Sequence, residues 1–418
     1  MSEADRLWNN LDLVLSRWGI TEIPFTESAP TAPRQAAQLR EVFTGRIQEL
    51  EIALTAFRGR ERRRVLVYGW YGIGKTAFII ELLGILRRKA KDTLATYISL
   101  PREAEDLATF ALVALAREME DDGWAQHVLQ QMGLRPRRRP VEKRTEVDVK
   151  FVKTSEETVP VSPPQFPTLS FEDLLERVFE KYKRVIIAID DLDKQSPSRV
   201  REMLRSAQGL LKGEASFILT SHPAGLTRDI LTRDLGLVDT AIQLEALDSD
   251  TTYRMLVNYL NSARPKHARR DPDDPLAVAP FTPETAHALC QRSEGVPRYL
   301  NRLGGYVLTW AVLQRADRIT SEVLRQGLAY ADSQLRSQHL TPEDHYVLEL
   351  VLGKGSVSDE TITLDDLERL KVREFNEVMP ILEKLVQLDL LRRLPTEGAA
   401  EFGPSPLLLN EKPPGKTT

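Results

Sequence analysis

The segment VLVYGWYGIGKTAFIIELL, residues 65–83, constrains the fold more than any other part of the chain. An apolar run that suits a buried strand stops at glycines, and an apolar run with helical spacing begins after Gly74, Lys75 and Thr76. Glycines at such a junction let the backbone N–H groups turn inward without Cβ atoms in the way. The start of the helix adds the positive end of the peptide dipoles. The segment therefore predicts a strand, an anion-binding loop and a helix.

The loop fits the phosphate-binding pattern G-x-x-x-x-G-K-[ST]. Lys75 is expected to neutralise the β- and γ-phosphates of a nucleotide, and the Thr76 hydroxyl is expected to take one Mg²⁺ position. The predicted cofactors are ATP and Mg²⁺. The predicted nucleotide contacts of the loop are Gly69, Tyr71, Gly72, Ile73, Gly74, Lys75, Thr76 and Ala77.

Acidic residues follow a second apolar run in VIIAIDDLD, residues 185–193. Asp190 ends this predicted strand and Asp191 lies just beyond it, so both face the phosphate loop if the sheet is parallel. Asp190 is expected to hold Mg²⁺ through its water shell, and Asp191 to orient or deprotonate the attacking water. Asp193 is a third acid, with either a direct role or a place on the surface or at a helix cap.

A third apolar run, ASFILTS, ends at polar residues. Its end is expected to lie between the loop and the acid pair. Thr220, or Ser221 in its place, could there sense the γ-phosphate or position water, and we assign the role to Thr220. His222 could either join this group or be an exposed loop residue.

The wider pattern alternates apolar strands with amphipathic helices, which predicts an α/β fold with a parallel sheet covered by helices on both faces. The strands are predicted at 65–69, 94–100, 184–190 and 215–221, and the helices at 76–88, 104–119, 170–182 and 197–211.

A chain of 418 residues predicts several domains. The pattern after residue 247 predicts helices. The last part of the chain predicts three helices followed by two strands about a glycine turn, which is typical of a winged helix-turn-helix. The predicted boundaries are a leader at 1–37, a P-loop core at 38–247 with an inserted loop at 134–168, a helical lid at 248–336, a winged helix at 337–409 and a disordered tail at 410–418.

Composition narrows the function classes. The formal net charge of −4 gives no global basic field. The single cysteine, Cys290, excludes an intramolecular disulfide and a cysteine-cluster metal site, and is expected to be a buried apolar residue. The amino terminus lacks the pattern of a signal peptide, and no apolar run approaches the ~20 residues that cross a bilayer. A cytoplasmic protein is expected.

Together these motifs resemble the AAA+/STAND superfamily of P-loop ATPases, in particular its origin-recognition-initiator and archaeal-type STAND branches, over about residues 38–408. VFTGRIQELEIAL resembles the box before the loop, and this resemblance places Gly45 and Arg46 beside the adenine. SEGVPRYLNRLGGY resembles the start of the last lid helices, which implies that Pro297 lies against the adenine and Arg298 near the γ-phosphate as a second sensor.

The resemblance implies a nucleotide-controlled switch or assembly ATPase. The pair Asp190-Asp191 replaces the Asp-Glu of many AAA+ motors, and because the shorter acid reaches less far we expect slow hydrolysis. By position, Arg228 and Arg233 are the candidates for an arginine finger, and the alternative is that they are helix-surface arginines. A protein partner or a homo-oligomer is expected.

The sequence leaves two classes of target possible, DNA and a protein partner. Action on DNA, in a replication, transposition or defence-type process, is favoured by the winged helix and by basic clusters that could make binding salt-dependent. The cluster with the best geometry is the arginine loop of Arg135, Arg137, Arg138 and Arg139; the others are residues 60–64 and 264–270.

The alternative is a STAND-type signalling switch whose winged helix engages a protein. The presumed recognition helix at 373–391 is acidic, which suits the major groove poorly, although Arg392 and Arg393 follow it on the predicted wing. A metabolic kinase is a third interpretation, but the predicted lid and winged helix are not the additional domains expected of such an enzyme.

Overall fold

The computed structural model describes residues 3–25, 39–59, 61–101, 104, 106–119, 121–134, 166–192, 197–222, 230–234, 236–394 and 400–408. The chain divides into two compact units. The sheet unit consists mainly of Arg46–Glu245, and the helical unit combines Met1–Pro30, Ala37–Gly45 and Ala246–Thr418. Residues 39–45, expected in the core, thus cluster with the helical unit.

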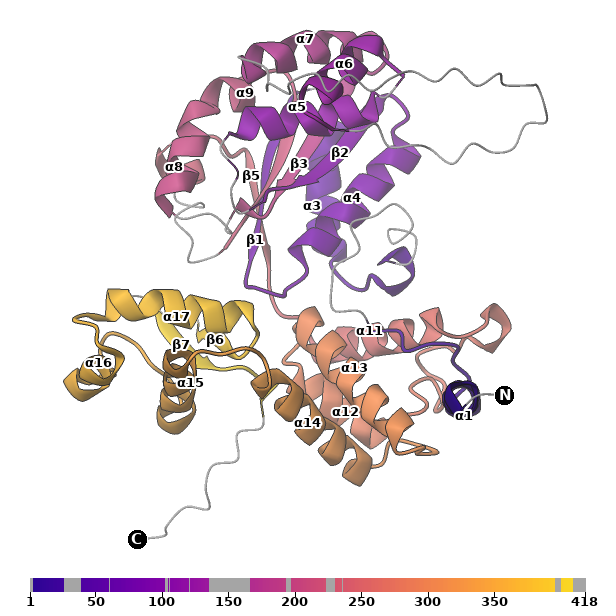
Figure 1. Cartoon of the computed structure of the whole chain (residues 1–418). Helices are drawn as coiled ribbons and strands as arrows, with labels where there is room; N and C mark the ends of the chain where they lie inside the picture. The colour runs from indigo at the N-terminus through magenta and orange to yellow at the C-terminus, as the bar shows by residue number, and fades with distance from the viewer. Residues whose placement is uncertain are drawn as a thin grey trace. The chain divides into compact units, whose positions relative to one another are not determined.

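The sheet unit contains a five-stranded parallel sheet in the order β2-β3-β4-β1-β5 (Figure 1). Helices α3 and α4 pack on one face, and α5 and α7 pack on the other. The predicted fold class is confirmed. The strands are β1 Arg64–Gly69, β2 Thr93–Ser99, β3 Arg184–Asp190, β4 Ser216–Ser221 and β5 Thr240–Leu244. The helices are α3 Ile47–Arg58, α4 Lys75–Lys89, α5 Leu107–Glu118, α6 Gly123–Gln131, α7 Pro167–Phe179, α8 Pro197–Ser206 and α9 Gln208–Lys212, with a π-helical turn η2 at Ile230–Asp234.

The order of the strands decides what can meet at the carboxyl edge of the sheet. Strand β4 lies between β1 and β3, with Leu219 beside both Leu66 and Ile189. Strand β2 pairs with the other side of β3, and Ser99 lies beside Asp190. The ends of β1, β4, β3 and β2 therefore converge at one edge, where α4 also begins.

Some elements of this unit were not predicted. Strand β5 is at the edge of the sheet and alternates buried with exposed residues, so it lacks the continuous apolar run of the central strands. Helix α6 follows a side-chain cap from Asp122. The single helix predicted at 197–211 is two helices that break at Ala207. The predicted insertion at 134–168 lies, from 135 to 165, outside the described residues.

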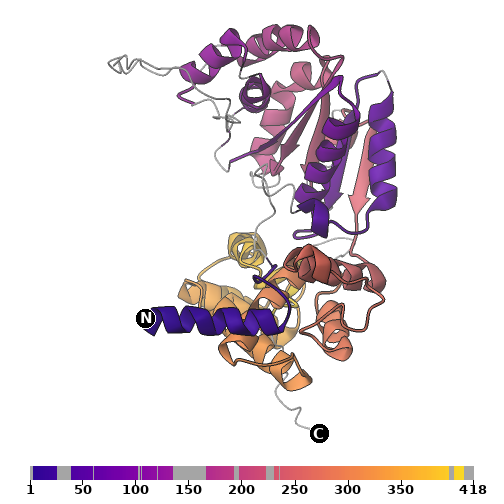
Figure 2. The same ribbon diagram turned by 90° about the vertical axis from the view of Figure 1, so that its right-hand side faces the viewer.

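The helical unit includes the leader. Helix α1, Glu3–Arg17, belongs to this unit together with the helices of the predicted lid (Figure 2). Trp18 Nε1 donates to the Ala316 carbonyl at 3.0 Å. The ring of Phe25 lies against Gly304, where an added Cβ would come within 2.6 Å of it. The other elements of this part are α11 Ser249–Ser262, a 3₁₀ turn η3 at Lys266–Ala268, α12 Pro283–Arg292, α13 Pro297–Leu313 and α14 Ser321–Arg336.

The last part of the chain folds as three helices followed by two antiparallel strands. These elements are α15 Pro342–Lys354, α16 Leu364–Leu370, α17 Phe375–Gln387, β6 Leu391–Leu394 and β7 Glu401–Pro404. One apolar core joins them to the leader and the lid helices, and Cys290 is buried in it, as expected. Among the described helices, none combines the length and apolar character that a membrane crossing needs.

Candidate active site

The turn from β1 into α4 has the backbone that a phosphate loop needs. Gly72 and Gly74 have φ of 79° and 98°, in the left-handed region that favours glycine. At Gly69, a Cβ would lie 2.7 Å from the Leu244 carbonyl oxygen and 2.8 Å from the Ile73 side chain. Strand β5 thus packs against the base of the loop, and only a residue without a side chain fits there.

Lys75 lies within this turn. Its Nζ donates to the Gly69 carbonyl at 2.7 Å and to the Trp70 carbonyl at 3.4 Å. These contacts hold the ammonium group at the loop, where a phosphate would meet its charge. The predicted loop residues Tyr71, Ile73 and Ala77 belong to the same turn and the first turn of α4.

The structure brings the two predicted metal-site residues together. Thr76 Oγ1, at the start of α4, donates to Asp190 Oδ2, at the end of β3, over 2.6 Å. Asp190 is 2% exposed. Its other oxygen, Oδ1, accepts the backbone N–H of Asp191 at 2.8 Å. A hydroxyl and a carboxylate in this contact form a pair of oxygen donors of the kind that Mg²⁺ prefers.

Asp191 has an unusual backbone for a residue other than glycine, with φ of 67°. Its N–H also donates to Thr220 Oγ1, at the end of β4, over 3.1 Å. Its carboxylate accepts a hydrogen bond from the Ser99 hydroxyl, at the end of β2. Strained residues that the surroundings hold in place cluster at functional sites. The predicted acid and the predicted sensor threonine are thus joined directly.

Two residues of this site were missed by the sequence analysis, namely Tyr97 and Ser99 on β2. The Tyr97 hydroxyl donates to Asp190 Oδ2 at 3.1 Å. Burial, and then the nearby carboxylates of Asp190 and Asp191, hold the pKa of Tyr97 well above its usual value, so it stays a donor. The signal available in the sequence is their spacing of two at the end of a strand, which places both side chains on one face.

The residues present fit Mg-ATP. Gly72 and Gly74 supply the left-handed backbone of a phosphate loop, Lys75 supplies a cation, and Thr76 and Asp190 supply oxygen donors side by side. Among the described residues, no cluster of three or more His, Cys, Asp or Glu side chains forms a metal site. A magnesium site that shares its ligands with a nucleotide needs no such cluster.

Comparison with known proteins agrees with this geometry. The family model for the KAP family P-loop domain matches residues 59–231, which run from before β1 into η2. These residues are a P-loop NTPase domain. The resemblance to P-loop ATPases predicted from the sequence is confirmed for these residues.

A curated relative and solved structures show similarity as well. The Holliday junction branch migration complex subunit RuvB of Methanoregula boonei is 33% identical over 119 residues, which are 28% of this chain and 34% of that protein. The match therefore spans about a third of the relative's length. The ORC1 protein of Aeropyrum pernix, solved in complex with DNA, is 18% identical over 93% of each chain, with a TM-score of 0.49. The RuvB branch migration motor of Thermotoga maritima is 16% identical over 88% of this chain and 94% of that one, with a TM-score of 0.43.

Arg46 contacts the predicted phosphate loop. Its side chain is 8% exposed and pairs with Glu49 at 3.2 Å. Its guanidinium donates to the Ile73 carbonyl at 3.4 Å and to the Glu245 carbonyl. Burial lowers the pKa of Arg46, and the contacts with Glu49 oppose this shift. Gly45 before it has φ of 72°. The adenine contacts predicted for Gly45 and Arg46 stay predictions.

His222 is not merely an exposed loop residue. Its ring meets the Trp70 ring edge-on, with the centroids 4.7 Å apart. The residue after β4 therefore packs on a residue of the predicted phosphate loop. Of the candidate arginine fingers, Arg233 is exposed in η2, whereas Arg228 lies outside the described residues, as does Asp193.

Arg298 and Pro297 begin helix α13 of the helical unit. Arg298 Nε donates to Asp389 Oδ2 at 2.8 Å, and Arg302 pairs with the same carboxylate oxygen. Asp389 is 1% exposed and follows α17. The predicted second sensor is therefore bound, in this unit, to the predicted winged helix. The roles of Pro297 and Arg298 toward the nucleotide stay predictions.

In the cluster at 264–270, Arg264, Arg269 and Arg270 have partners within the helical unit. Arg264 is 5% exposed and donates to the carbonyls of Ala277 and Ala279 at 2.9 and 2.8 Å. Its guanidinium binds loop carbonyl oxygens because the loop after α11 folds back over it. Arg269 pairs with Glu41 at 2.7 Å and Arg270 with Asp274 at 3.1 Å.

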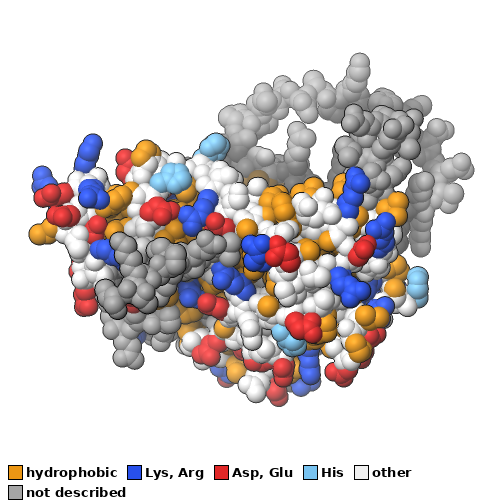
Figure 3. Space-filling model, turned by 90° about the horizontal axis from the view of Figure 1, so that it is seen from below, with side chains coloured by type: hydrophobic (Ala, Val, Ile, Leu, Met, Phe, Trp, Pro, Cys, Tyr) orange, Lys and Arg blue, Asp and Glu red, His pale blue; other side chains and the backbone are white. Residues whose placement is uncertain are grey.

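The wing arginines are also paired within the helical unit. Arg392 pairs with Glu294, and Arg393 pairs with Glu383 on α17 and lies over the Phe402 ring. The face drawn in Figure 3 intersperses basic and acidic side chains. The arginine loop of Arg135, Arg137, Arg138 and Arg139 lies outside the described residues.

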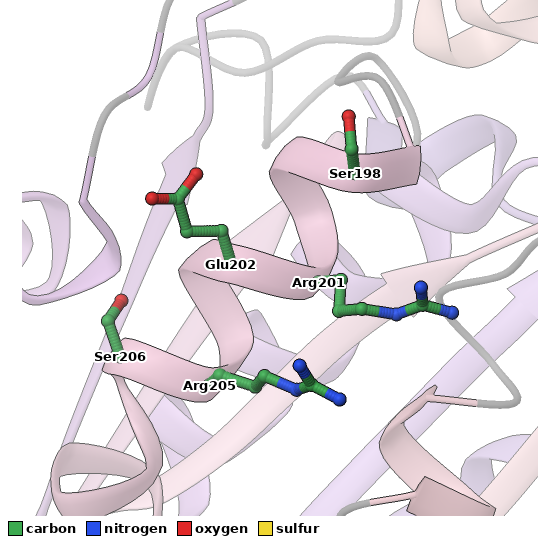
Figure 4. Close-up of a pocket in the computed structure, with 5 residues that line it drawn as sticks. All are labelled: Ser198, Arg201, Glu202, Arg205 and Ser206. Atoms are coloured by element: carbon green, nitrogen blue, oxygen red, sulfur yellow. The ribbon is translucent and has the colours of Figure 1, made fainter.

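A depression runs along α8 of the P-loop NTPase domain. Arg201 and Arg205 extend to one side of the helix, whereas Glu202 and Ser206 extend to the other (Figure 4). All four side chains are exposed. A pair of solvated arginines one helical turn apart explains this surface without a ligand.

Proposed function

We propose that this protein is an Mg²⁺-dependent ATPase that acts as a nucleotide-controlled switch. The observation that carries the proposal is the 2.6 Å hydrogen bond between Thr76 and Asp190, which are 114 residues apart in the chain. It places the two predicted metal-site groups together at the loop that ends with Lys75. A glycine-rich turn without a ligand has no need of a buried carboxylate at that position.

The residues divide the chemistry among them. The metal, when bound, would offset the negative charge of the phosphates. Lys75 and the loop N–H groups bind the phosphates, and Thr76 and Asp190 hold the metal. Asp191, fixed by Ser99 and by its own N–H to Thr220, orients the attacking water and accepts its proton.

In this proposal, a residue of the helical unit senses which nucleotide is bound. Arg298, the predicted second sensor, is tied to Asp389 at the end of α17. We propose that the γ-phosphate of ATP competes with Asp389 for this guanidinium, so that ATP and ADP favour different arrangements of the predicted winged helix. A guanidinium suits both partners because it donates to either anion in the same fork geometry.

DNA is the first candidate target. The support is the arginine loop predicted at 135–139 and the similarity to a curated protein that bears the name of a Holliday junction branch migration subunit. Arginines on a loop can neutralise several phosphates, and binding then falls steeply with salt.

A protein partner is the second candidate, because Arg392 and Arg393 are engaged by Glu294 and Glu383 rather than presented together. On this reading the acidic helix α17 and its wing serve the fold and a protein contact instead of a DNA groove.

The test measures ATP binding and duplex binding by the full chain. Wild type should bind Mg-ATP, and Lys75→Ala should not; unchanged ATP affinity in that variant refutes the proposed nucleotide site. Duplex affinity is then measured at two salt concentrations for wild type and for the triple change of Arg137, Arg138 and Arg139 to Ala. A matched triple change of the exposed residues Arg201, Arg205 and Arg318 to Ala controls for the loss of positive charge. If the variant of Arg137, Arg138 and Arg139 binds duplex DNA as well as the control variant does, a protein partner is favoured.

A further inference from the structure

Tyr97 occupies a position that the roles assigned so far do not explain. It is two residues before Ser99, which pairs with Asp190 across the β2–β3 ladder, so Tyr97 is diagonal to Asp190. The partner of Tyr97 in the register is Ala188, so its long side chain must reach two residues further along β3 to meet Asp190. The hydroxyl spans this gap and donates to Asp190 Oδ2 at 3.1 Å.

Two hydroxyls from different elements thus meet at one carboxylate oxygen. Thr76 reaches Oδ2 from α4, and Tyr97 reaches it from β2. The opposite oxygen, Oδ1, is held by the backbone N–H of Asp191. These three donors restrict rotation of the carboxylate, and Tyr97 is the one among them that belongs neither to the phosphate loop helix nor to the acid pair.

We propose that Tyr97 is a positioning residue for Mg²⁺, which holds Asp190 Oδ2 toward Thr76 so that the metal finds its donors already in place. The proposal rests on the proposed ATPase function. A threonine that ligates a metal through its oxygen has a single proton left to donate. A donor on a rigid ring keeps the carboxylate aimed without being a ligand itself. Partners of this kind, behind the ligands, commonly govern metal affinity.

A purely structural role for the Tyr97 hydroxyl is the competing explanation, and the same strand offers the comparison. Thr96, the preceding residue, is 2% exposed and donates to the Ala114 carbonyl at 3.1 Å. This bond joins the sheet to α5 on the opposite face. Removal of either hydroxyl takes one buried hydrogen bond from β2, but only the loss at Tyr97 changes the surroundings of Asp190.

The experiment compares Tyr97→Phe with Thr96→Val in the full chain. Tyr97→Phe should raise the Mg²⁺ concentration for half-maximal ATP hydrolysis about tenfold, because supporting partners of metal ligands typically contribute this much. Calorimetry should show the same loss in the gain of ATP affinity that Mg²⁺ produces, with affinity in EDTA unchanged. Saturating Mg²⁺ should restore kcat to within about threefold, as expected when an orienting contact is lost. Thr96→Val should leave the Mg²⁺ dependence as in wild type.

A double-mutant cycle with Asp190→Asn tests the route of the effect. If Tyr97 acts through Asp190, adding Tyr97→Phe to Asp190→Asn should produce no further change in Mg²⁺ dependence. An unchanged Mg²⁺ dependence in Tyr97→Phe, or an equal fall in activity at every Mg²⁺ concentration, overturns the proposal and leaves the ATPase function standing. A wild-type protein without Mg-dependent ATP binding overturns the ATPase function itself.

Discussion

Arg298 and Asp389 are joined by a 2.8 Å hydrogen bond from Nε to Oδ2, although 91 residues separate them in the chain. Arg302, one turn further along α13, pairs with the same oxygen. The carboxylate is 1% exposed and its residue has φ of 59°. One buried acid therefore ties the start of α13 to the turn before the strands β6 and β7.

Asp389→Asn should release this tie without a new backbone strain, because asparagine tolerates the left-handed region. We expect a loss of about 1–3 kcal/mol in unfolding free energy, since two guanidinium groups lose a charged partner. Urea unfolding measures this loss. On the proposed sensing role of Arg298, the ratio of ATP to ADP affinity should rise, because a neutral amide competes less strongly than a carboxylate for the guanidinium. Glu322→Gln, which breaks an exposed pair with Arg325, is the control and should change stability by less than about 0.5 kcal/mol. An unaltered ATP to ADP ratio in Asp389→Asn argues against a sensing role for Arg298.

Asp191→Asn should bind ATP and lose hydrolysis. Asparagine preserves the backbone conformation at φ of 67° but cannot accept a proton from water. We expect the single-turnover rate to fall by about 100-fold or more, the usual contribution of a positioned general base. Rapid-quench measurement with labelled ATP tests this. Normal turnover would move the role to another acid, with Asp193 the first to examine.

Thr220→Val should impair the positioning of Asp191 while leaving ATP binding largely intact. The variant keeps the branched shape but leaves the Asp191 N–H with Asp190 as its remaining acceptor. We expect kcat to fall about tenfold, which corresponds to roughly 1.4 kcal/mol, with little change in ATP affinity. Ser221→Ala is the matched control, because that hydroxyl donates to the adjacent His222 carbonyl. Equal effects of the two changes on kcat would remove Thr220 from the site.

Stability should decrease in acid through the helix-capping carboxylate of Asp366. Burial raises its pKa, but hydrogen bonds from Lys354, Thr363 and Tyr346 outweigh burial and hold the pKa well below its usual value. The unfolded chain then binds the proton more readily than the folded one. The stabilisation is therefore complete above the unfolded pKa of about 3.9 and is lost as the pH falls toward the folded pKa.

Asp366→Asn should accordingly flatten this part of the pH dependence. Urea unfolding at pH 7, 5, 4 and 3 should show a smaller decline for the variant than for wild type, with a lower starting stability at pH 7. Asp365→Asn, at the neighbouring exposed position, should follow the wild-type curve. Parallel curves for Asp366→Asn and wild type would show that the carboxylate does not contribute in this way.

The sequence by itself determined the P-loop, the acid pair and the parallel sheet. These features depend on local pattern, since the glycines, lysine and threonine of the loop are contiguous, and buried central strands show as unbroken apolar runs. The same reasoning placed Asp190 and Asp191 at the edge of the sheet, because a parallel strand that ends in acids presents them at its carboxyl end.

The tertiary structure decided what local pattern does not encode. Tyr97 and Ser99 became part of the site only because β2 pairs with β3 in a particular register. Arg264 became a buried partner of carbonyls, and Asp389 became the anchor of Arg298. Strand β5 was not predicted, because at the edge of the sheet its buried and exposed residues alternate and form no continuous apolar run. In each case the partner of a polar group lies far along the chain, and hydrogen-bond partners follow from register and packing rather than from the neighbouring residues.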